Sequence, residues 1–438
     1  MNVLIIGSGG REHALCVSCK KSKNINEIYC VPGNAGTDLI AKNVPIEISD
    51  FKKIKDFVKK EKIEIVIVGP EKPLVNGIVD YLEKNNIKTF GPNQLASKLE
   101  GSKIFTKKLC EKYNIPTANF GIFNNYTDAN NFIEKCNLPI VVKADGLASG
   151  KGVYICDKKE EALNAIKEIF DGKFGLAKEI LIEEFLNGEE MSYFIISDGE
   201  TYLPFGTAQD HKRVLEGDKG KNTGGMGAYS PSRLENENLN NKIINKIINP
   251  TLSGLKDLNT DFKGFLYAGL MIVNNEPFLI EYNVRMGDPE CQTILPKLKT
   301  DFIKLITACV NKNLSTINLE WYDDKSLCIV LCSKGYPEIY KNNIEIKNLK
   351  DIKLNQNEFI IRDIELNNTN GGSCKIIVSK RKSSLDRVNV FDVDIGKYRV
   401  DSIRSFEMKM NLNSEKSFND FIGRIERLKT QTLDLLNQ

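Results

Sequence analysis

The stretch VVKADGLASGKGV, residues 141–153, decides between two classes of fold. It is rich in glycine, like the phosphate-binding P-loop that joins a strand to a helix, but it departs from that pattern in two places. Three residues separate Gly146 from Gly150 where a P-loop has four, and Gly152 stands where a P-loop has the Ser or Thr that contacts magnesium. Strand-like apolar segments stand on both sides. We therefore predict the tip of a β-hairpin, either one that covers phosphates or an ordinary surface turn.

Lys143 lies at the end of the first of these strands, on the same face as Val141. A lysine at the end of a buried strand is costly unless it meets an anion. The backbone N–H groups of the glycine-rich loop can fold over the same anion. This pattern favours a phosphate ligand, with a solvated lysine at the strand end as the alternative.

The segment EYNVRMGDPE, residues 281–290, is the strongest candidate for a metal and anion site. Side chains alternate along a strand, so Glu281, Asn283 and Arg285 share one side. Carboxylate and amide oxygens are ligands that magnesium takes, and the arginine offers a planar fork for an oxyanion. An exposed polar strand face is the alternative. The alternate side chains are expected to enter the core: Phe278, Ile280 and Tyr282.

Residues 1–92 contain four short apolar runs, at 2–7, 27–33, 64–70 and 88–92, that end in glycine or proline with helical segments between them. This alternation predicts a parallel sheet with crossover helices, whose ligands lie beyond the carboxyl ends of the strands. The polar tips GSGGRE, PGNAG and GPEKPL fall there. Gly7 and Gly9 match the start of a dinucleotide fingerprint, but Glu12 replaces its third glycine. A phosphate ligand, a plain turn and a nicotinamide cofactor all remain open.

The rest of the chain reads as two further units. The second begins near Ser102 and contains a helix over 159–170, an antiparallel pair that turns at 198–199, and a hairpin that turns at 274–275. The third begins near Ser326 with short strands and includes an amphipathic helix over 415–436.

Composition excludes several classes of function. The 438 residues carry 61 basic and 58 acidic side chains with no long basic block, which argues against nucleic-acid binding. No apolar run approaches the roughly 18 residues of a membrane span. Eleven scattered cysteines suit a reducing compartment, and Cys16 and Cys19 form a CxxC within an apolar helical pattern that predicts buried thiols. Two histidines make a histidine-built metal centre improbable. We expect a soluble, cytoplasmic protein.

Ten stretches from residue 1 to about 300 resemble, in order, the ATP-grasp ligases and specifically the phosphoribosylamine–glycine ligase family. They are GSGGREHAL, PGNAGT, IVGPEKPLVNGIVD, FGPNQLASKLEGSKIFTK, IVVKADGLASGKGV, IEEFLNGEEMSYF, QDHKR, NTGGMGAYSP, GFLYAGLMI and IEYNVRMGDPE. RMGDPECQ is similar to the specific family signature RxGDPExQ. The match is good to about residue 337 and patchy beyond it, where TNGGSCKIIV has Ser373 in place of an arginine.

The resemblance implies an α/β and α+β multidomain fold. Its parts are an N-terminal parallel-sheet α/β domain over 1–101, an ATP-grasp core over 102–325 with a small lid subdomain at about 117–191, and a C-terminal mixed α+β domain over 326–438 with an atypical tail. ATP is expected between the core and the lid.

The resemblance also implies the site residues. Lys143 and Arg285 are expected to be catalytic, and Glu281 with Asn283 to hold Mg²⁺ or Mn²⁺. The expected ATP contacts are Lys103, Lys143, Gly146, Ser149, Gly150, Lys151, Gly152, Glu183, Glu184, Phe185, Leu186 and Glu190. The expected substrate contacts are Gly9, Gly10, Asn34, Glu71 and His211 for the ribosylamine, and Arg285, Gly287, Asp288, Pro289 and Glu290 for glycine.

The implied reaction joins glycine to 5-phosphoribosylamine through a glycyl phosphate, in purine biosynthesis, with ATP cleaved to ADP and phosphate. We expect a monomer whose partners are small molecules, with no nucleic acid and no membrane. The alternatives are a carboxylase acting on a purine intermediate or biotin, a nicotinamide oxidoreductase, and a nucleotide-binding protein that has lost activity.

Overall fold

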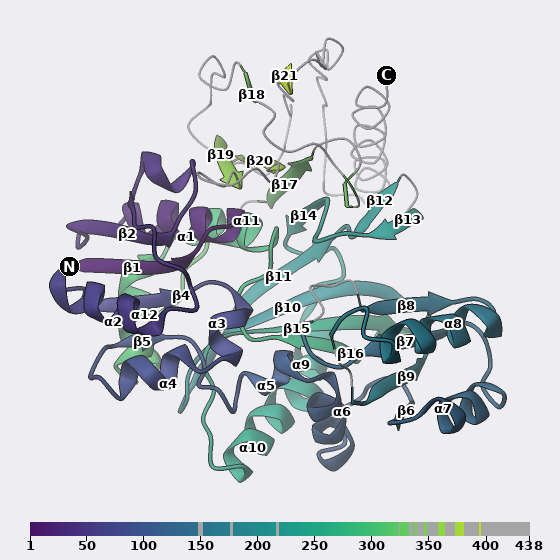
Figure 1. Ribbon diagram of the computed structural model, residues 1–438. Coiled ribbons are helices and arrows are strands. Elements are labelled where there is room, and N and C mark those ends of the chain that lie inside the picture. The colour runs from purple at the N-terminus through teal and green to yellow at the C-terminus, as the bar shows by residue number, and fades with distance from the viewer. Residues whose placement is uncertain are drawn as a thin grey trace.

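The computed structural model describes residues 1–147, 152–175, 178–215, 219–323, 325–332, 336–337 and 339, and beyond them the strands at 346–347, 358–363, 373–380 and 394–395. Figure 1 shows the chain coloured from purple at the N-terminus to yellow. Ser149, Gly150 and Lys151, and the helix predicted over 415–436, lie outside the described residues.

The N-terminal region forms a five-stranded parallel sheet in the order β3-β2-β1-β4-β5. The four predicted runs are confirmed as strands, and the two-residue β3 was not predicted. The strands are β1 (Asn2–Gly7), β2 (Glu27–Pro32), β3 (Lys42–Asn43), β4 (Ile65–Val68) and β5 (Thr89–Phe90). The connecting helices are α1 (Gly10–Lys20), η1 (Thr37–Leu39), α2 (Phe51–Lys60), α3 (Glu71–Val75), α4 (Ile78–Glu83) and α5 (Lys98–Gly101).

A large eight-stranded sheet lies beside it, in the order β16-β15-β10-β11-β14-β17-β20-β19. Its strands are β10 (Glu189–Asp198), β11 (Tyr202–Asp210), β14 (Gly227–Ser230), β15 (Lys263–Val273), β16 (Glu276–Asn283), β17 (Lys325–Leu331), β19 (Glu358–Asp363) and β20 (Ser373–Lys380). The turns predicted at 198–199 and 274–275 are confirmed, and Asn274 and Asn275 both have positive φ, as a tight hairpin turn requires. Strands from beyond residue 325 thus extend this sheet.

Further helices and two-stranded pairs flank these two sheets. They are α6 (Lys103–Lys112), α9 (Glu237–Ile243), η2 (Ile244–Ile248, a π-helix), α10 (Asn249–Asp257), α11 (Cys291–Ile294), η3 (Leu295–Lys297), α12 (Phe302–Val310), η4 (Leu314–Thr316), and the two-stranded pairs β12 (Arg213–Leu215) with β13 (Lys219–Asn222) and β18 (Ile346–Lys347) with β21 (Asp394–Ile395).

Two apolar cores run through both sheets. Leu4 and Ile6 of β1 pack in one core with Tyr193 of β10 and Tyr282 of β16. The neighbouring residue Ile5 packs in the other core, with residues of α1 and α12. When alternate side chains of one strand enter two different cores, the sheet is covered on both faces. The shared cores fix the N-terminal sheet against the large sheet.

A separate four-stranded sheet, in the order β6-β9-β7-β8, projects from the rest of the molecule at the right of Figure 1. It contains β6 (Phe120–Phe123), β7 (Ile140–Ala144), β8 (Val153–Cys156) and β9 (Ile180–Glu184), covered by α7 (Tyr126–Ile133) and α8 (Lys159–Phe170). It has its own apolar core, which includes Ile133, Val142, Ile166 and Ile182. β7 and β8 pair antiparallel, so the predicted hairpin around the glycine-rich loop is confirmed.

The prediction that Phe278, Ile280 and Tyr282 all enter the core was wrong. The pairing of β15 with β16 shifts register, because Gly269 faces Glu281 while Leu270 faces Leu279. A bulge of this kind inserts one extra residue and reverses the alternation. Leu279 and Tyr282 are therefore both buried, and Ile280 lines a pocket beside Glu281.

The prediction of buried thiols at Cys16 and Cys19 is confirmed, since both are free and fully buried. Burial raises the pKa of both thiols, which keeps them protonated and unreactive. In the part of the chain that the structure describes, no helix is long and apolar enough to cross a membrane.

Candidate active site

The start of α6 is tied to the end of β7. The Ser102 hydroxyl accepts the Phe105 N–H at 3.1 Å, as an N-cap does, and donates to the Asp145 carboxylate at 3.1 Å. One residue further, Lys103 Nζ donates to the carbonyl of Gly146 at 2.9 Å. The N–H of Ala144 bonds the carbonyl of Gly152 at 2.8 Å and closes the hairpin. Lys103 is thus held at the base of the glycine-rich loop.

Lys143 lies on β7 next to Glu183 of β9. The two side chains are about 5% and 4% exposed, and Lys143 Nζ is 2.8 Å from Glu183 Oε2. The other carboxylate oxygen is 3.3 Å from Nζ of Lys107, which was not predicted. The side chain of Glu183 therefore faces two lysines. Its neighbour Glu184 is exposed and accepts the backbone N–H of Asn119 at 2.9 Å.

Glu281 lies on β16 opposite Gly269, and Asn283 lies on the same face opposite Tyr267. Burial pushes the pKa of Glu281 upward, but the charges of Lys212, Lys103, Lys143 and Arg285 outweigh it, so the pKa is lowered. The carboxylate thus stays ionised and lies within the electrostatic field of both lysines from the region of the glycine-rich loop. This is the charge arrangement that a magnesium–triphosphate complex requires.

The donor set at Glu281 and Asn283 fits a hard divalent cation. An ionised carboxylate oxygen and an amide oxygen are suitable ligands, and the lysines would repel a cation that arrived without phosphate. Within the described residues, no group of three or more His, Cys, Asp or Glu side chains is arranged to hold a metal. The two oxygens therefore suit a metal whose other ligands are phosphate oxygens and water.

Glu190 and Glu281 line one pocket together with Lys212. Lys212 Nζ contacts Glu190 Oε2 at 3.0 Å, and this carboxylate raises the pKa of Lys212 well above its usual value. Ser192 and Tyr267 line the same pocket and are joined by a 2.9 Å hydrogen bond. Lys212 was not among the predicted site residues, although it lies in the QDHKR motif.

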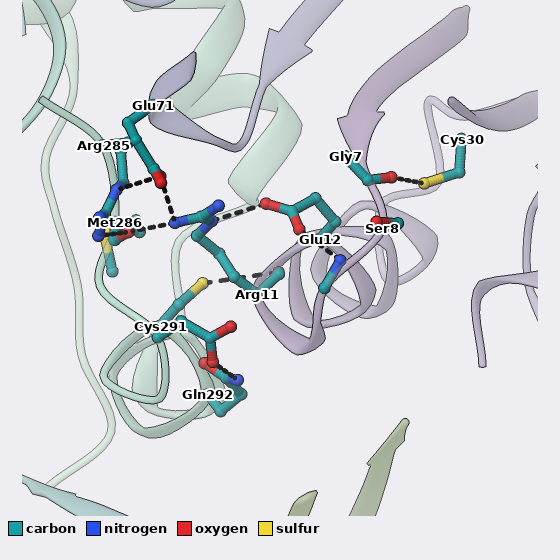
Figure 2. Close-up of polar contacts among 12 residues, drawn as sticks. Gly7, Ser8, Arg11, Glu12, Cys30, Glu71, Arg285, Met286, Cys291 and Gln292 are labelled. Carbon is teal, nitrogen blue, oxygen red and sulfur yellow. Dashed lines mark hydrogen bonds and ion pairs between the residues drawn. The ribbon is translucent and has the colours of Figure 1, made fainter. Parts of the chain in front are cut away.

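Arg285 is held by two carboxylates, as Figure 2 shows in part. Its Nε lies 3.3 Å from Glu71 and its Nη2 lies 2.8 Å from Glu100. Arg11, another residue that was not predicted, lies 4.0 Å from Glu71 and donates to the carbonyl of Met286 at 3.3 Å. This chain of charges joins the N-terminal sheet region to the end of β16. Two carboxylates lie beside the guanidinium of Arg285, so a substrate anion would share it with them, and its buried Nε makes no hydrogen bond within the described residues.

Glu100 is the buried end of this chain, with its side chain 7% exposed. Its second oxygen accepts the N–H of Val284 at 2.8 Å. Burial raises the pKa of Glu100, an effect that Arg285 only partly offsets, whereas the pKa of Glu71 is lowered because Arg285 and Arg11 outweigh its burial. Glu71 is therefore the carboxylate whose pKa the two arginines hold below its usual value.

The GDPE turn packs against the NTGGMG loop. A Cβ at Gly225, which has φ +112°, would lie 2.4 Å from Pro289, so only glycine fits this contact. Asp288 Oδ1 accepts the side-chain N–H of Gln292 at 2.5 Å, and Glu290 is buried and accepts the Ser192 hydroxyl at 3.3 Å. Gly287 lies against the Glu290 carboxylate. The turn thus places two carboxylates at the end of β16, next to Arg285.

Two of the three N-terminal tips meet around Asn34. Its side-chain amide donates to the carbonyls of Ser8 and Gly9 at 2.7 and 3.3 Å, and its oxygen accepts two backbone N–H groups. The N–H of Gly9 bonds Glu12 Oε2 at 2.7 Å. In this state Asn34 and the Gly9 amide shape the turns. His211 bonds through its backbone and lies beside Tyr229.

Glu12 explains why the dinucleotide fingerprint is incomplete. Its side chain lies so close to Gly7 and Gly69 that a Cβ on either glycine would come within 2.3 Å of it. The space beside the first strand, which a dinucleotide's pyrophosphate needs, is occupied. The geometry therefore disfavours a nicotinamide cofactor.

Comparison with known proteins agrees with this geometry. Two family models match the chain: the N domain of phosphoribosylglycinamide synthetase over residues 1–100, and the ATP-grasp (A) domain of phosphoribosylglycinamide synthetase over residues 101–291. The phosphoribosylamine–glycine ligase of Mesorhizobium japonicum is 48% identical over 338 residues, which cover 77% of this chain and 80% of that protein. The ligase of Clostridium acetobutylicum is 43% identical and covers 80% and 85%.

Solved structures show the same fold. The crystal structure of phosphoribosylamine–glycine ligase from Thermotoga maritima has a TM-score of 0.74 and 30% identity, and covers 87% of this chain and 93% of that chain. The biotin carboxylase domain of a Hydrogenobacter thermophilus 2-oxoglutarate carboxylase has a TM-score of 0.65 at 14% identity, which shows the ATP-grasp fold alone. The chain therefore belongs to the phosphoribosylamine–glycine ligase family.

Proposed function

We propose that this chain joins glycine to 5-phosphoribosylamine and cleaves ATP to ADP and phosphate. The observation that carries the proposal is that Lys103, bonded to the base of the glycine-rich loop, and the buried Lys143 both act electrostatically on the ionised Glu281 of β16. Such an arrangement binds a metal-complexed triphosphate, and family membership supports the choice of glycine over bicarbonate as the acid that is activated.

We propose the nucleotide contacts as follows. Lys103 and Lys143 hold the phosphates, and the glycine-rich loop from Gly146 to Gly152, with Ser149, Gly150 and Lys151, closes over them. The segment from Glu183 to Leu186 spans the end of the lid strand β9 and the two residues after it. Its backbone can contact adenine there, and Glu190 accepts the ribose hydroxyls. Glu190 and Glu281 line one pocket, which supports ribose and metal lying a short distance apart.

The chemistry starts from a poor electrophile, the carboxylate of glycine. Transfer of the γ-phosphoryl group to a carboxylate oxygen gives glycyl phosphate and ADP. The amine of phosphoribosylamine then attacks the carbonyl carbon and expels phosphate, which keeps that oxygen. Both partners of the first step are anions, so Lys143 and Arg285 must offset their repulsion. A metal at Glu281 and Asn283 supplies further charge neutralisation of the phosphates.

Glycine is placed at the GDPE turn. Arg285 grips its carboxylate, while Asp288 or Glu290 keeps its ammonium charged and unable to act as a nucleophile. Gly287 and Pro289 shape this pocket. The ribosylamine is placed at the N-terminal tips, with its phosphate near Gly9, Gly10 and Asn34 and its amine or ribose near Glu71 or His211. Support for the last placement comes from Glu71, whose carboxylate stays charged next to Arg285.

Asp288→Asn should raise the KM for glycine by roughly ten- to a hundredfold, because losing a hydrogen bond to a charged group costs about 1.5–3 kcal/mol. The KM for ATP should hardly change. Steady-state kinetics with each substrate varied in turn measures both, and the exposed Asp56→Asn on α2 serves as the control. Equal increases in both KM values would remove Asp288 from the glycine site.

The finer assignments are also proposals. We propose Mg²⁺ or Mn²⁺ as the metal, a monomer as the active form, the cytoplasm as its location, and no nucleic-acid partner. We further propose domains at 1–101, 102–325, with a lid at about 117–191, and 326–438. The separate apolar core of the lid sheet supports its movement as a unit.

The function is tested by ADP release with ATP, metal, glycine and freshly generated phosphoribosylamine, each omitted in turn. We expect release that needs all four, with glycinamide ribonucleotide as the product by mass spectrometry. Release that depends on bicarbonate instead would favour a carboxylase, and no release under any condition would favour a nucleotide-binding protein without activity.

A further inference from the structure

Lys107 of α6 is a buried cation that no nucleotide contact explains. Its side chain is 3% exposed, and its ammonium makes three contacts. It donates to the hydroxyl of Thr117 at 2.6 Å and the carbonyl of Ala118 at 3.2 Å, and it lies 3.3 Å from Glu183 Oε1. Two of the three N–H groups of this ammonium are thus used in hydrogen bonds, and Glu183 adds an ion pair without a hydrogen bond to its Oε1.

Glu183 stands between Lys107 and Lys143 and gives one oxygen to each. Helix α6 and strand β7 place these two lysines beside Glu183. Lys103 and Lys107 are one turn apart on α6, so the helix directs one cation to the glycine-rich loop and the other to β9. In the pairing of β7 with β9, Glu183 faces Val141, which places it diagonally across from Lys143 on the same face.

Three lysines gather in this buried cluster, next to Glu183 and within the field of Glu281 and Asp145. Lys103, Lys107 and Lys143 provide three cations, and Glu183 is the single carboxylate that contacts Lys107 and Lys143 among the described residues. Burial lowers the pKa of Lys103 and of Lys107. Lys107 and Lys143 share one contacting carboxylate, so an anion that reaches Lys143 would stabilise its buried charge further. Because Thr117, Ala118 and Glu183 surround the ammonium of Lys107, we expect that anion to meet Lys143 and Lys103.

We propose that Lys107 and Glu183 are positioning residues that keep Lys143 available to the phosphates of ATP. Lys107 pairs with one oxygen of Glu183, so the negative charge of this carboxylate is divided between two lysines. Glu183 can therefore orient Lys143 without fully neutralising it. Lys107 itself does not touch the nucleotide. The proposal rests on the proposed function in that it takes the anion to be ATP.

The proposal predicts an unusual pair of results. In Lys107→Met, Glu183 has Lys143 as its remaining partner, so the two close into a neutral ion pair. The affinity for ADP should fall roughly tenfold. In the double variant Lys107→Met, Glu183→Gln, no carboxylate neutralises Lys143, and most of the lost affinity should return.

Calorimetric titration of the full chain with Mg²⁺-ADP, without glycine or ribosylamine, makes the test. Lys108→Met is the matched control, since Lys108 is the exposed neighbour on the same helix. Thermal unfolding shows which variants are folded, and Lys107→Gln replaces Lys107→Met if the latter is not. Wild-type affinity in the single variant, or a double variant that binds no better than the single one, would overturn the proposal. A wild-type protein that binds ADP but does not ligate glycine would instead count against the proposed function.

Discussion

Lys143→Met should abolish ATP cleavage while leaving the chain folded. Methionine fills the buried space of the lysine stem, and Glu183 keeps Lys107 as a partner, so the lid core is preserved. What is lost is a cation directed at the transferring phosphoryl group. Removing one such electrostatic contact typically costs 10²- to 10³-fold in kcat, and we expect a loss of at least about 10³-fold.

The measurement is ADP release under saturating glycine and ribosylamine, with circular dichroism to verify folding. Lys135→Met provides the control, because Lys135 is an exposed residue of the same lid. Turnover at the wild-type rate in Lys143→Met would show that this lysine has no part in phosphoryl transfer.

Glu281→Gln should lower kcat by a similar factor, but for a different physical reason. The amide keeps the shape of the side chain but removes the ionised oxygen that draws a divalent cation to the phosphates. We expect kcat to fall by at least about 10³-fold and the metal concentration needed for half-maximal activity to rise.

The direction of the change in metal-free ADP affinity distinguishes the loss of a metal ligand from general damage to the site. Without metal, the variant should bind ADP at least as well as the wild-type protein does, because a negative charge near the phosphates is gone. Added metal should then improve binding much less than in the wild type. Glu276→Gln, in the exposed part of the same strand, is the control. A variant that loses metal-free ADP binding would point to a collapsed site instead.

Local patterns were sufficient to predict most of the fold. The four N-terminal strands are short apolar runs that end in glycine or proline, and their burial on both faces leaves a clear signal in the sequence. The helix over 159–170 and the turn at Asn274-Asn275 also coincide with the structure, since helical periodicity and turn chemistry are set by residues close together in the sequence. The bulge at Ile280 was missed because it depends on how β16 pairs with β15.

Only those site residues that belong to recognisable sequence motifs were predicted. Lys143 and Glu281 stand out in the sequence because strand ends carry unexpected polar residues. Lys107 and Glu100 carry no such signal, since each is one charged residue on a helix, where a solvated position is the usual outcome. Their partners Glu183 and Arg285 lie 76 and 185 residues away along the chain, so only the tertiary fold reveals them.

The central claim is that the site with Lys143 and Glu281 activates the carboxylate of glycine with ATP. Glycine labelled with ¹⁸O in its carboxylate tests this claim most directly, when phosphate released in a complete reaction with phosphoribosylamine is examined by mass spectrometry. The account predicts one ¹⁸O atom in each phosphate released, because the oxygen that attacks the γ-phosphorus leaves with it. Unlabelled phosphate formed at the same rate as ADP would contradict it.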